Sequence, residues 1–300
     1  MPIPAARPSI GVVKFASCDG CQLTLLDLED QLLALAERFD IVEFPEASSA
    51  RSAGPYDVLL VEGSVSAPDH LPRIRALREQ ARVLVTIGAC ATSGGIQALR
   101  NFADAKAFHA AVYPQPEYVE SLATSTPISA HVKVDYELRG CPIDSGQLVE
   151  LLTAIATGRR PQLRDESVCM ECKRRGAVCV MVTRGEPCLG QVTQAGCGAI
   201  CPRYGRGCYG CFGPREQANV RALAQRFTGV GAMEAETVAR LFAGIHSAAE
   251  PFRTAHAAHG GAPAQSAVAR GAGGGSGQVG AAGAAAPSSP VGTMGARGDR

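Results

Sequence analysis

Tryptophan is absent from this 300-residue chain, and aromatic residues make up only 5% of it. Charge of one sign is not in excess either, because 29 basic residues stand against 28 acidic ones, which gives a formal net charge of +1. This balance provides no electrostatic basis for binding nucleic acid or anionic lipid. Partners of this chain must therefore be recognised at specific sites.

Long hydrophobic runs are also missing. No stretch approaches the roughly 18 continuous apolar residues that a membrane-spanning helix needs. The first residues, MPIPAARPSIGVVKFAS, contain no twin arginine and no apolar segment followed by a cleavage site. We therefore expect a cytoplasmic protein, in which thiols stay reduced and numerous cysteines usually bind metal.

Cysteine, in contrast, is abundant: the chain has 12, none after residue 211, and they divide into three sets of four. Hydrophobic residues make up 46% of the chain. That is enough for one large domain or two modest ones, so the chain is not a small fold held together by disulfides. The cysteines are candidates for metal ligands.

Short apolar runs alternate with amphipathic stretches between residues 9 and 158. Strands are predicted in IGVVKFA, DIVEF, YDVLLVEG, RVLVTIGA and HVKVDYEL, and helices in LTLLDLEDQLLALAERF, LPRIRALREQA and GQLVELLTAIAT. Asp144 or Ser145 caps the last helix, which ends at Gly158. The predicted fold class is α/β, with a flavodoxin-like, doubly wound parallel sheet in a domain over residues 1–158.

Composition changes after this domain. Residues 159–214 contain eight cysteines and little apolar sequence, which predicts a small irregular domain held together by metal. Residues 215–256 predict a helical hairpin around the turn TGVG, and residues 257–300, mostly Ala, Gly, Ser and Pro, predict a disordered tail. Within the first domain, residues 113–128 predict a long irregular loop, a kind that is often functional or contacts a partner.

Four cysteines follow predicted strands: Cys18 and Cys21 the first, Cys90 the fourth and Cys141 the fifth. The carboxyl ends of parallel strands share one edge of a sheet, where ligands bind, so these cysteines are expected to form a single site. Neighbouring glycines permit positive φ angles and close backbone approach. An Fe–S cluster is favoured; a redox dithiol, a zinc site and, for Cys90, a buried apolar role stay open.

The other eight cysteines form two consecutive groups with the spacings C-x2-C-x6-C-x8-C and C-x3-C-x6-C-x2-C. They are Cys169, Cys172, Cys179, Cys188 and then Cys197, Cys201, Cys208, Cys211. Zinc ribbons can have similar spacing, and CGAICP matches the end of a bacterial ferredoxin motif whose last cysteine ligates the other cluster. The division between the groups therefore stays open. Residues 173–175, KRR, are either charges that tune an anionic cluster or part of a solvated loop.

Several motifs together resemble the small, electron-transfer subunit of a [NiFe] hydrogenase. They are CDGC (18–21), VEGSV (61–65), GACATSGG (88–95) and RGCPIDSGQL (139–148), followed by the cysteine-rich region. Relative to membrane-bound members, cysteine replaces a histidine at Cys169 and a proline at Cys201. All-cysteine ligation without a leader is more similar to the cytosolic NAD(P)-linked bidirectional and sulfhydrogenase types, whose small subunit is called delta.

The resemblance implies three [4Fe–4S] clusters. The proximal one is on Cys18, Cys21, Cys90 and Cys141, the distal one on Cys169, Cys172, Cys179 and Cys188, and the medial one on Cys197, Cys201, Cys208 and Cys211. It implies partners: a large subunit with the NiFe centre, a diaphorase subunit with FAD and NAD(P), and an additional Fe–S subunit. The function implied is electron relay in reversible H2 oxidation coupled to NAD(P)+ reduction, with no catalytic residue on this chain.

Some features have more than one interpretation. Glu62, at the end of the third strand, either supports the proximal site or a proton route, or is an ordinary turn or cap carboxylate. The histidines have no metal-site spacing; they are at positions 70, 109, 131, 246, 256 and 259. GAGGGSGQVG (271–280) follows no strand, so it predicts no nucleotide site, and the terminal RGD is a chance match.

Two alternatives to the hydrogenase function remain. One is the Fe–S subunit of a complex I-like quinone reductase, which normally carries one cluster with adjacent cysteines rather than CDGC. The other is a zinc-bound interaction scaffold.

Overall fold

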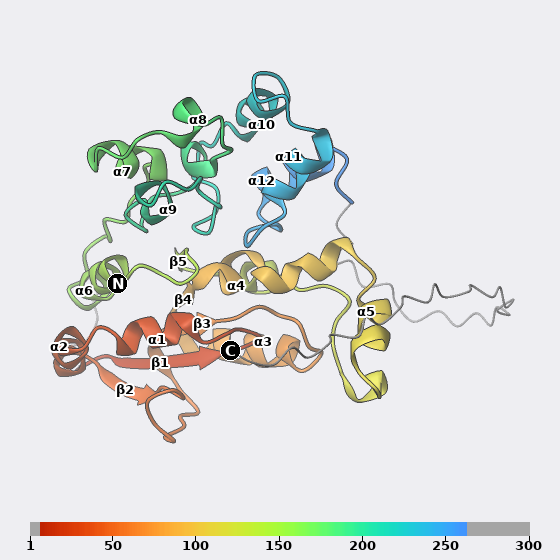
Figure 1. Ribbon diagram of the computed structural model, residues 1–300. Helices are drawn as coiled ribbons and strands as arrows, with labels where there is room; N and C mark the ends of the chain where they lie inside the picture. The colour runs from red at the N-terminus through yellow and green to blue at the C-terminus, as the bar shows by residue number, and fades with distance from the viewer. Residues whose placement is uncertain (1–6, 263–300) are drawn as a thin grey trace, which may run out of the picture. The chain divides into compact units, whose positions relative to one another are not determined.

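The computed structural model describes residues 7–262, which fall within one compact unit. Its centre is a five-stranded parallel sheet in the order β2-β1-β3-β4-β5 (Figure 1). The strands are β1 Ser9–Lys14, β2 Asp40–Glu43, β3 Tyr56–Glu62, β4 Ala81–Ile87 and β5 Tyr136–Leu138. This is the flavodoxin-like strand order, so the predicted fold class is confirmed.

Helices cover both faces of the sheet. Those of the sheet region are α1 Gly20–Leu26, α2 Asp30–Arg38, α3 His70–Gln80, α4 Gly88–Ser93, α5 Ala105–Val112 and α6 Ser145–Ala156. One face packs against apolar residues of α1, α2 and α6, and the other against Ile74 of α3 and the turn at Ile128–Ala130. Successive strand residues alternate between the two faces: Val58 and Leu60 point to one, Leu59 and Val61 to the other.

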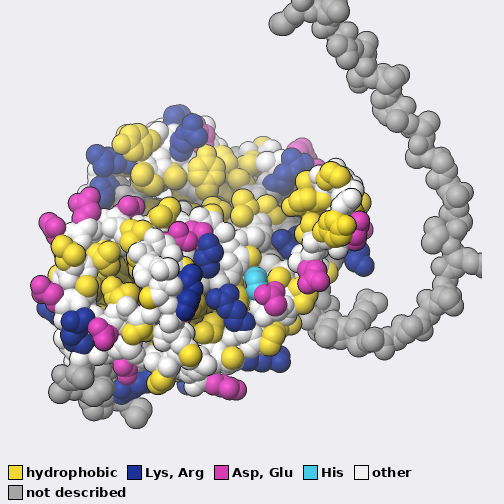
Figure 2. All heavy atoms as spheres, turned by 90° about the horizontal axis from the view of Figure 1, so that it is seen from below, with side chains coloured by type: hydrophobic (Ala, Val, Ile, Leu, Met, Phe, Trp, Pro, Cys, Tyr) yellow, Lys and Arg dark blue, Asp and Glu magenta, His cyan; other side chains and the backbone are white. Residues whose placement is uncertain are grey.

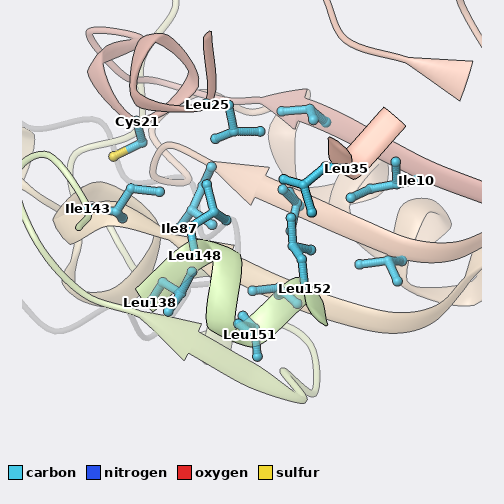
Figure 3. Packing of buried hydrophobic residues seen from close by; sticks show 14 of the residues in the cluster. Ile10, Cys21, Leu25, Leu35, Ile87, Leu138, Ile143, Leu148, Leu151 and Leu152 are labelled. Carbon is cyan, nitrogen blue, oxygen red and sulfur yellow. The ribbon is translucent and has the colours of Figure 1, made fainter. Parts of the chain in front are cut away.

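The cluster on the first face extends to the carboxyl edge of the sheet. Leu148 and Leu151 of α6 are fully buried in it, and Cys21 of α1 is one of its members. Figure 3 shows Cys21 at one end of the cluster near Ile143. The same apolar packing that stabilises the sheet therefore fixes the helix that carries this cysteine.

One predicted helix is two helices in the structure. Residues 23–39 were expected to form a single helix, but α1 ends at Leu26 and α2 begins at Asp30. Glu29, with φ 50°, turns the chain between them. Asp30 lies in the first turn of α2, where the helix dipole favours an acidic side chain, so the acidic residues in LEDQ mark a helix start.

The cysteine-rich region contains only short helices. They are α7 Val168–Arg174, α8 Val180–Thr183 and α9 Ile200–Arg203, with a 3-10 turn at Leu189–Gln191. Its own buried apolar cluster consists of Val168, Ala199 and Cys208, with three further cysteines packed against them. The prediction of an irregular region with little apolar core is confirmed for these residues.

Three helices follow, where a hairpin of two was predicted: α10 Val220–Thr228, α11 Ala235–Phe242 and α12 Glu250–Ala258. Helix α12 crosses the predicted start of the tail at residue 257, because Phe252 and Ala255 are buried in a core shared by all three helices. Pro251 in its first turn, after Glu250, is a helix-start signal that the sequence contained. Residues 263–300, with the glycine-rich segment and the terminal RGD, lie outside the described residues.

The surface and the long loop agree with the composition. Figure 2 shows acidic and basic side chains interspersed on one face. No helix between residues 7 and 262 is long and apolar enough to cross a membrane.

Residues 113–128 are irregular apart from a 3-10 turn at Pro116–Tyr118, and Thr126 pairs with Val65 beside β3. The predicted domain divisions at residues 158 and 214 remain predictions.

Candidate metal centres

The four cysteines at the sheet edge come from three connections. Cys18 lies between β1 and α1, Cys21 in α1, Cys90 in α4, and Cys141 shortly after β5. All four are free thiols. Burial, together with the neighbouring Cys141 and Cys18, raises the pKa of Cys90 to about 11. The structure thus brings together the residues that the strand order predicted would meet; their binding of one cluster remains a prediction.

Glycines leave room for two of these sulfurs. A Cβ atom at Gly88 would lie 2.4 Å from Sγ of Cys21, and one at Gly95 would lie 2.6 Å from Sγ of Cys90. Both glycines have positive φ, 83° and 64°. Within CDGC (18–21) the residue with a left-handed backbone is not the glycine: Asp19 has φ 65°, and Gly20 is helical. Side chains larger than hydrogen are therefore excluded next to these two thiols.

Glu62 is buried at the end of β3, with 2% of its surface exposed. The backbone N–H of Cys21 donates to its Oε1 at 3.1 Å, and Nε2 of Gln22 donates to its Oε2 at 2.8 Å. Burial raises the pKa of this carboxyl above its ordinary value. Glu62 therefore holds the first turn of α1 in place, which fixes the position of Cys21.

The second group of cysteines surrounds a small cavity. Cys169, Cys172, Cys179 and Cys188 all line it, together with apolar side chains that include Val168 and Met181. Burial raises the pKa of Cys172, and the nearby Cys169, Cys188 and Cys179 raise it as well. Thiols around a largely apolar cavity suit an Fe–S cluster, because thiolates are its ligands and the surroundings keep water away.

The third group lies around Cys211. Burial, together with Cys197 and Cys201, raises the pKa of Cys211 to about 12. Burial raises the pKa of Cys208, and Cys188 of the second group raises it more than Cys211 does. Ala199, between Cys197 and Cys201, adopts a left-handed φ of 55°, which folds the CGAIC segment back on itself.

The three groups form a row whose spatial order differs from the order in the sequence. The backbone N–H of Cys208 donates to Sγ of Cys188 at 3.2 Å, so the third group contacts the second. Cys211 is also affected by the charge of Cys141, so the third group lies next to the first. The third group is therefore in the middle of the row.

The three basic side chains of residues 173–175 have different neighbours. Lys173 lies near Cys169 and lowers its pKa against the effect of burial. Arg174 forms an ion pair with Glu166, while Arg175 reaches the third group, since a Cβ atom at Gly198 would lie 2.7 Å from its Nη2. Two of the three charges therefore lie beside cysteine groups. Among residues 7–262, no three His, Cys, Asp or Glu side chains are arranged to hold a single metal ion.

Comparison with solved structures agrees with this fold. The chain superposes on an actinobacterial-type NiFe-hydrogenase from Ralstonia eutropha H16 with a TM-score of 0.51, covering 72% of this chain and 82% of that one. The identity is 19%, so this likeness concerns the fold. The chain therefore has the fold of this class of hydrogenase subunit, with four cysteines at the carboxyl edge of its sheet.

Sequence comparison identifies the family. Residues 18–155 match the family described as NADH ubiquinone oxidoreductase, 20 kDa subunit. The chain is 39% identical over 214 residues to Sulfhydrogenase 2 subunit delta of Pyrococcus furiosus, covering 71% of this chain and 90% of the relative. It is 28% identical to NAD-reducing hydrogenase HoxS subunit delta of Cupriavidus necator over 50% of this chain and 79% of the relative. The chain therefore belongs to the family of hydrogenase small subunits that includes sulfhydrogenase subunit delta.

Proposed function

We propose that this hydrogenase subunit relays electrons through three [4Fe–4S] clusters, between the NiFe centre of a partner large subunit and an NAD(P)-linked partner. The observation that carries the proposal is the row of three four-cysteine groups. The group at the sheet edge is proximal, the group around Cys211 is medial, and the group around the apolar cavity is distal. Clusters bound there would accept and pass on one electron at a time.

The chain's own residues would hold each cluster and control its surroundings. Buried thiols such as Cys90 and Cys211 must lose their protons when iron binds, so loading releases protons. Glu62 fixes a proximal ligand through the backbone, and Lys173 places a positive charge near the distal group. A positive charge next to an anionic cluster favours its reduced form.

The partners follow from the same proposal. They are the NiFe large subunit, a diaphorase subunit carrying FAD and NAD(P), and an additional Fe–S subunit, in a cytoplasmic complex that couples reversible H2 oxidation to NAD(P)+ reduction. One relative is named an NAD-reducing hydrogenase subunit, which supports the nucleotide as acceptor. The balanced charge supports neither nucleic acid nor membrane as a partner.

Metal analysis of anaerobically purified protein tests the cluster content. We expect about twelve iron atoms per chain, four in each of three cubanes, and a matching amount of acid-labile sulfide. Zinc without labile sulfide would instead support the interaction scaffold and exclude the relay.

A variant tests the place of the first group. Cys18→Ser should remove the proximal cluster and stop H2-dependent NAD(P)+ reduction, while reduction of artificial dyes by NAD(P)H in the partner subunits continues. Thr24→Ser, in the helix α1 that follows Cys18, is the control, because it changes no thiol. Coupled H2 oxidation at the normal rate in Cys18→Ser would contradict the assignment.

A further inference from the structure

A histidine that no sequence motif singled out lies between two of the cysteine groups. His246 follows α11 and is 2% exposed. Its Nε2 lies 3.0 Å from the carbonyl oxygen of Cys211, and its Nδ1 lies 2.8 Å from Oγ of Ser93. Ser93 belongs to α4, the helix that carries Cys90. One side chain therefore bonds to both the medial loop and the proximal helix.

The hydrogen atoms can be placed from the partners. A carbonyl oxygen only accepts, so Nε2 carries a hydrogen and donates it to Cys211. Nδ1 forms the second hydrogen bond, to the Ser93 hydroxyl, which also lies 3.0 Å from the carbonyl oxygen of Ala89. The ring thus has a partner at each nitrogen.

The loop that His246 holds has little freedom to move. A Cβ atom at Gly213 would lie 2.7 Å from Nδ1 of His246, so the ring packs directly on this loop. Arg139 donates to the carbonyl oxygen of Pro214 at 2.6 Å. The ring of Phe212 would lie 2.9 Å from a Cβ at Gly140. The loop from Cys211 to Pro214 is therefore packed against the segment that leads to Cys141.

We infer that His246 is a positioning residue: its two hydrogen bonds fix the medial-cluster loop against the proximal-cluster helix and so set the contact between these two clusters. The inference rests on the proposed function, because it assumes that Cys211 and Cys90 hold neighbouring clusters. His246 lies 35 positions after Cys211, the last proposed ligand, and acts on the relay through a hydrogen bond to the backbone of that residue.

The test uses the holoenzyme complex and three variants. His246→Phe keeps a ring of similar size but removes both hydrogen bonds, and His246→Gln retains an amide N–H that can donate to Cys211. His256→Phe is the matched control, since His256 is also buried but bonds to Ala239 within the C-terminal helices. The measurements are iron content, the magnetic interaction between the reduced proximal and medial clusters in EPR spectra, and the medial reduction potential.

We expect His246→Phe to retain its iron, to lose magnetic interaction between the two clusters and to shift the medial potential. His246→Gln should restore both properties in part, and His256→Phe should leave both at the wild-type values. Unchanged interaction and potential in an iron-replete His246→Phe complex would overturn the inference.

Two further results separate the possible failures. If the wild-type complex itself lacks three clusters, the proposed function fails before the inference is reached. If His246→Phe does not fold, Ser93→Ala serves instead, because it removes one of the two hydrogen bonds and leaves the Cys211 bond. Ser93→Ala should weaken the magnetic interaction, and its full retention would count against the inference.

Discussion

Glu62 shows how one carboxylate positions a neighbouring cysteine. It accepts from the backbone of Cys21 and from the side chain of Gln22, two donors that would otherwise be buried without a partner. Leaving a buried donor unpaired is more costly than losing an average hydrogen bond. The contribution of Glu62 to stability therefore depends on which groups its replacement leaves unsatisfied.

Glu62→Leu should lower the free energy of unfolding by about 1–3 kcal/mol for each donor left unpaired. Glu62→Gln should cost less. Oε1 of Gln22 has no partner at present, so the Gln22 amide can turn and accept from the new amide. Urea unfolding followed by circular dichroism measures both, with the exposed Glu79→Leu as control. Equal losses for Leu and Gln would contradict this explanation.

For individual residues, the sequence predicted that the sheet-edge cysteines converge, but it did not predict the contacts that support them. The convergence of Cys90 with Cys21 follows from strand order, which hydrophobic periodicity reveals. The bonds of Glu62 and His246 join residues 41 and 153 positions apart, and neither pairing leaves a local pattern. Such contacts follow only from tertiary packing, so the sequence left Glu62 with several interpretations.

Among elements, the C-terminal end of α6 connects the sheet region to the cysteine-rich region. Glu150 of α6 accepts two hydrogen bonds from Arg159, each 2.6 Å, and one from the backbone N–H of Gln162 at 2.9 Å. These bonds, above all the two from Arg159, lower the pKa of Glu150 to about 2. The connecting segment is thereby tied back to its helix.

This ion pair should depend on pH in a defined direction. A carboxyl whose pKa is lowered on folding stabilises the folded state above its ordinary pKa of 4.5, and the effect is lost as pH falls toward about 2. In wild-type protein the Glu150 carboxyl should therefore titrate by NMR near pH 2. A titration near the ordinary value would show that the ion pair is absent in solution.

Removing the Glu150 carboxylate should loosen the connecting segment at neutral pH. Glu150→Gln should speed hydrogen exchange in residues 159–162, because the N–H of Gln162 loses a charged acceptor. Glu37→Gln, on the exposed surface of α2, is the control. Equal exchange in all three proteins would contradict the role of Glu150.

Element boundaries were harder to predict than element types. The leucines of residues 23–39 fit one helical period, and only the acidic residues around Glu29 indicate the break. Helix α12 was missed although Glu250 and Pro251 mark its start, because the alanine-rich composition around it resembles that of the tail. Composition averages over several residues, whereas a helix start depends on two or three.

Across the whole molecule, two kinds of stabilisation are combined. The sheet has a large apolar cluster on each face, while the cysteine-rich region has three residues in a cluster of its own. The first part resembles an ordinary folded domain, and the second requires other interactions to stay folded. Bound Fe–S clusters would supply these interactions.

Removal of iron should therefore affect the two parts differently. After chelation under reducing conditions, residues 168–211 should lose protection from hydrogen exchange, while β1, β3 and β4 keep theirs. Hydrogen-exchange mass spectrometry of loaded and chelated protein compares them directly. Simultaneous loss of protection in the sheet would show that the whole chain depends on metal.

The bond from Cys208 to Sγ of Cys188 has a consequence for changes in the cysteine-rich region. A gene segment that encodes the sheet and its edge carries one complete set of thiols. The two later sets are consecutive in the sequence, but Cys208 of one set donates its backbone N–H to Cys188 of the other. A change at either residue therefore alters the surroundings of both later sets, while the thiols at the sheet edge keep theirs.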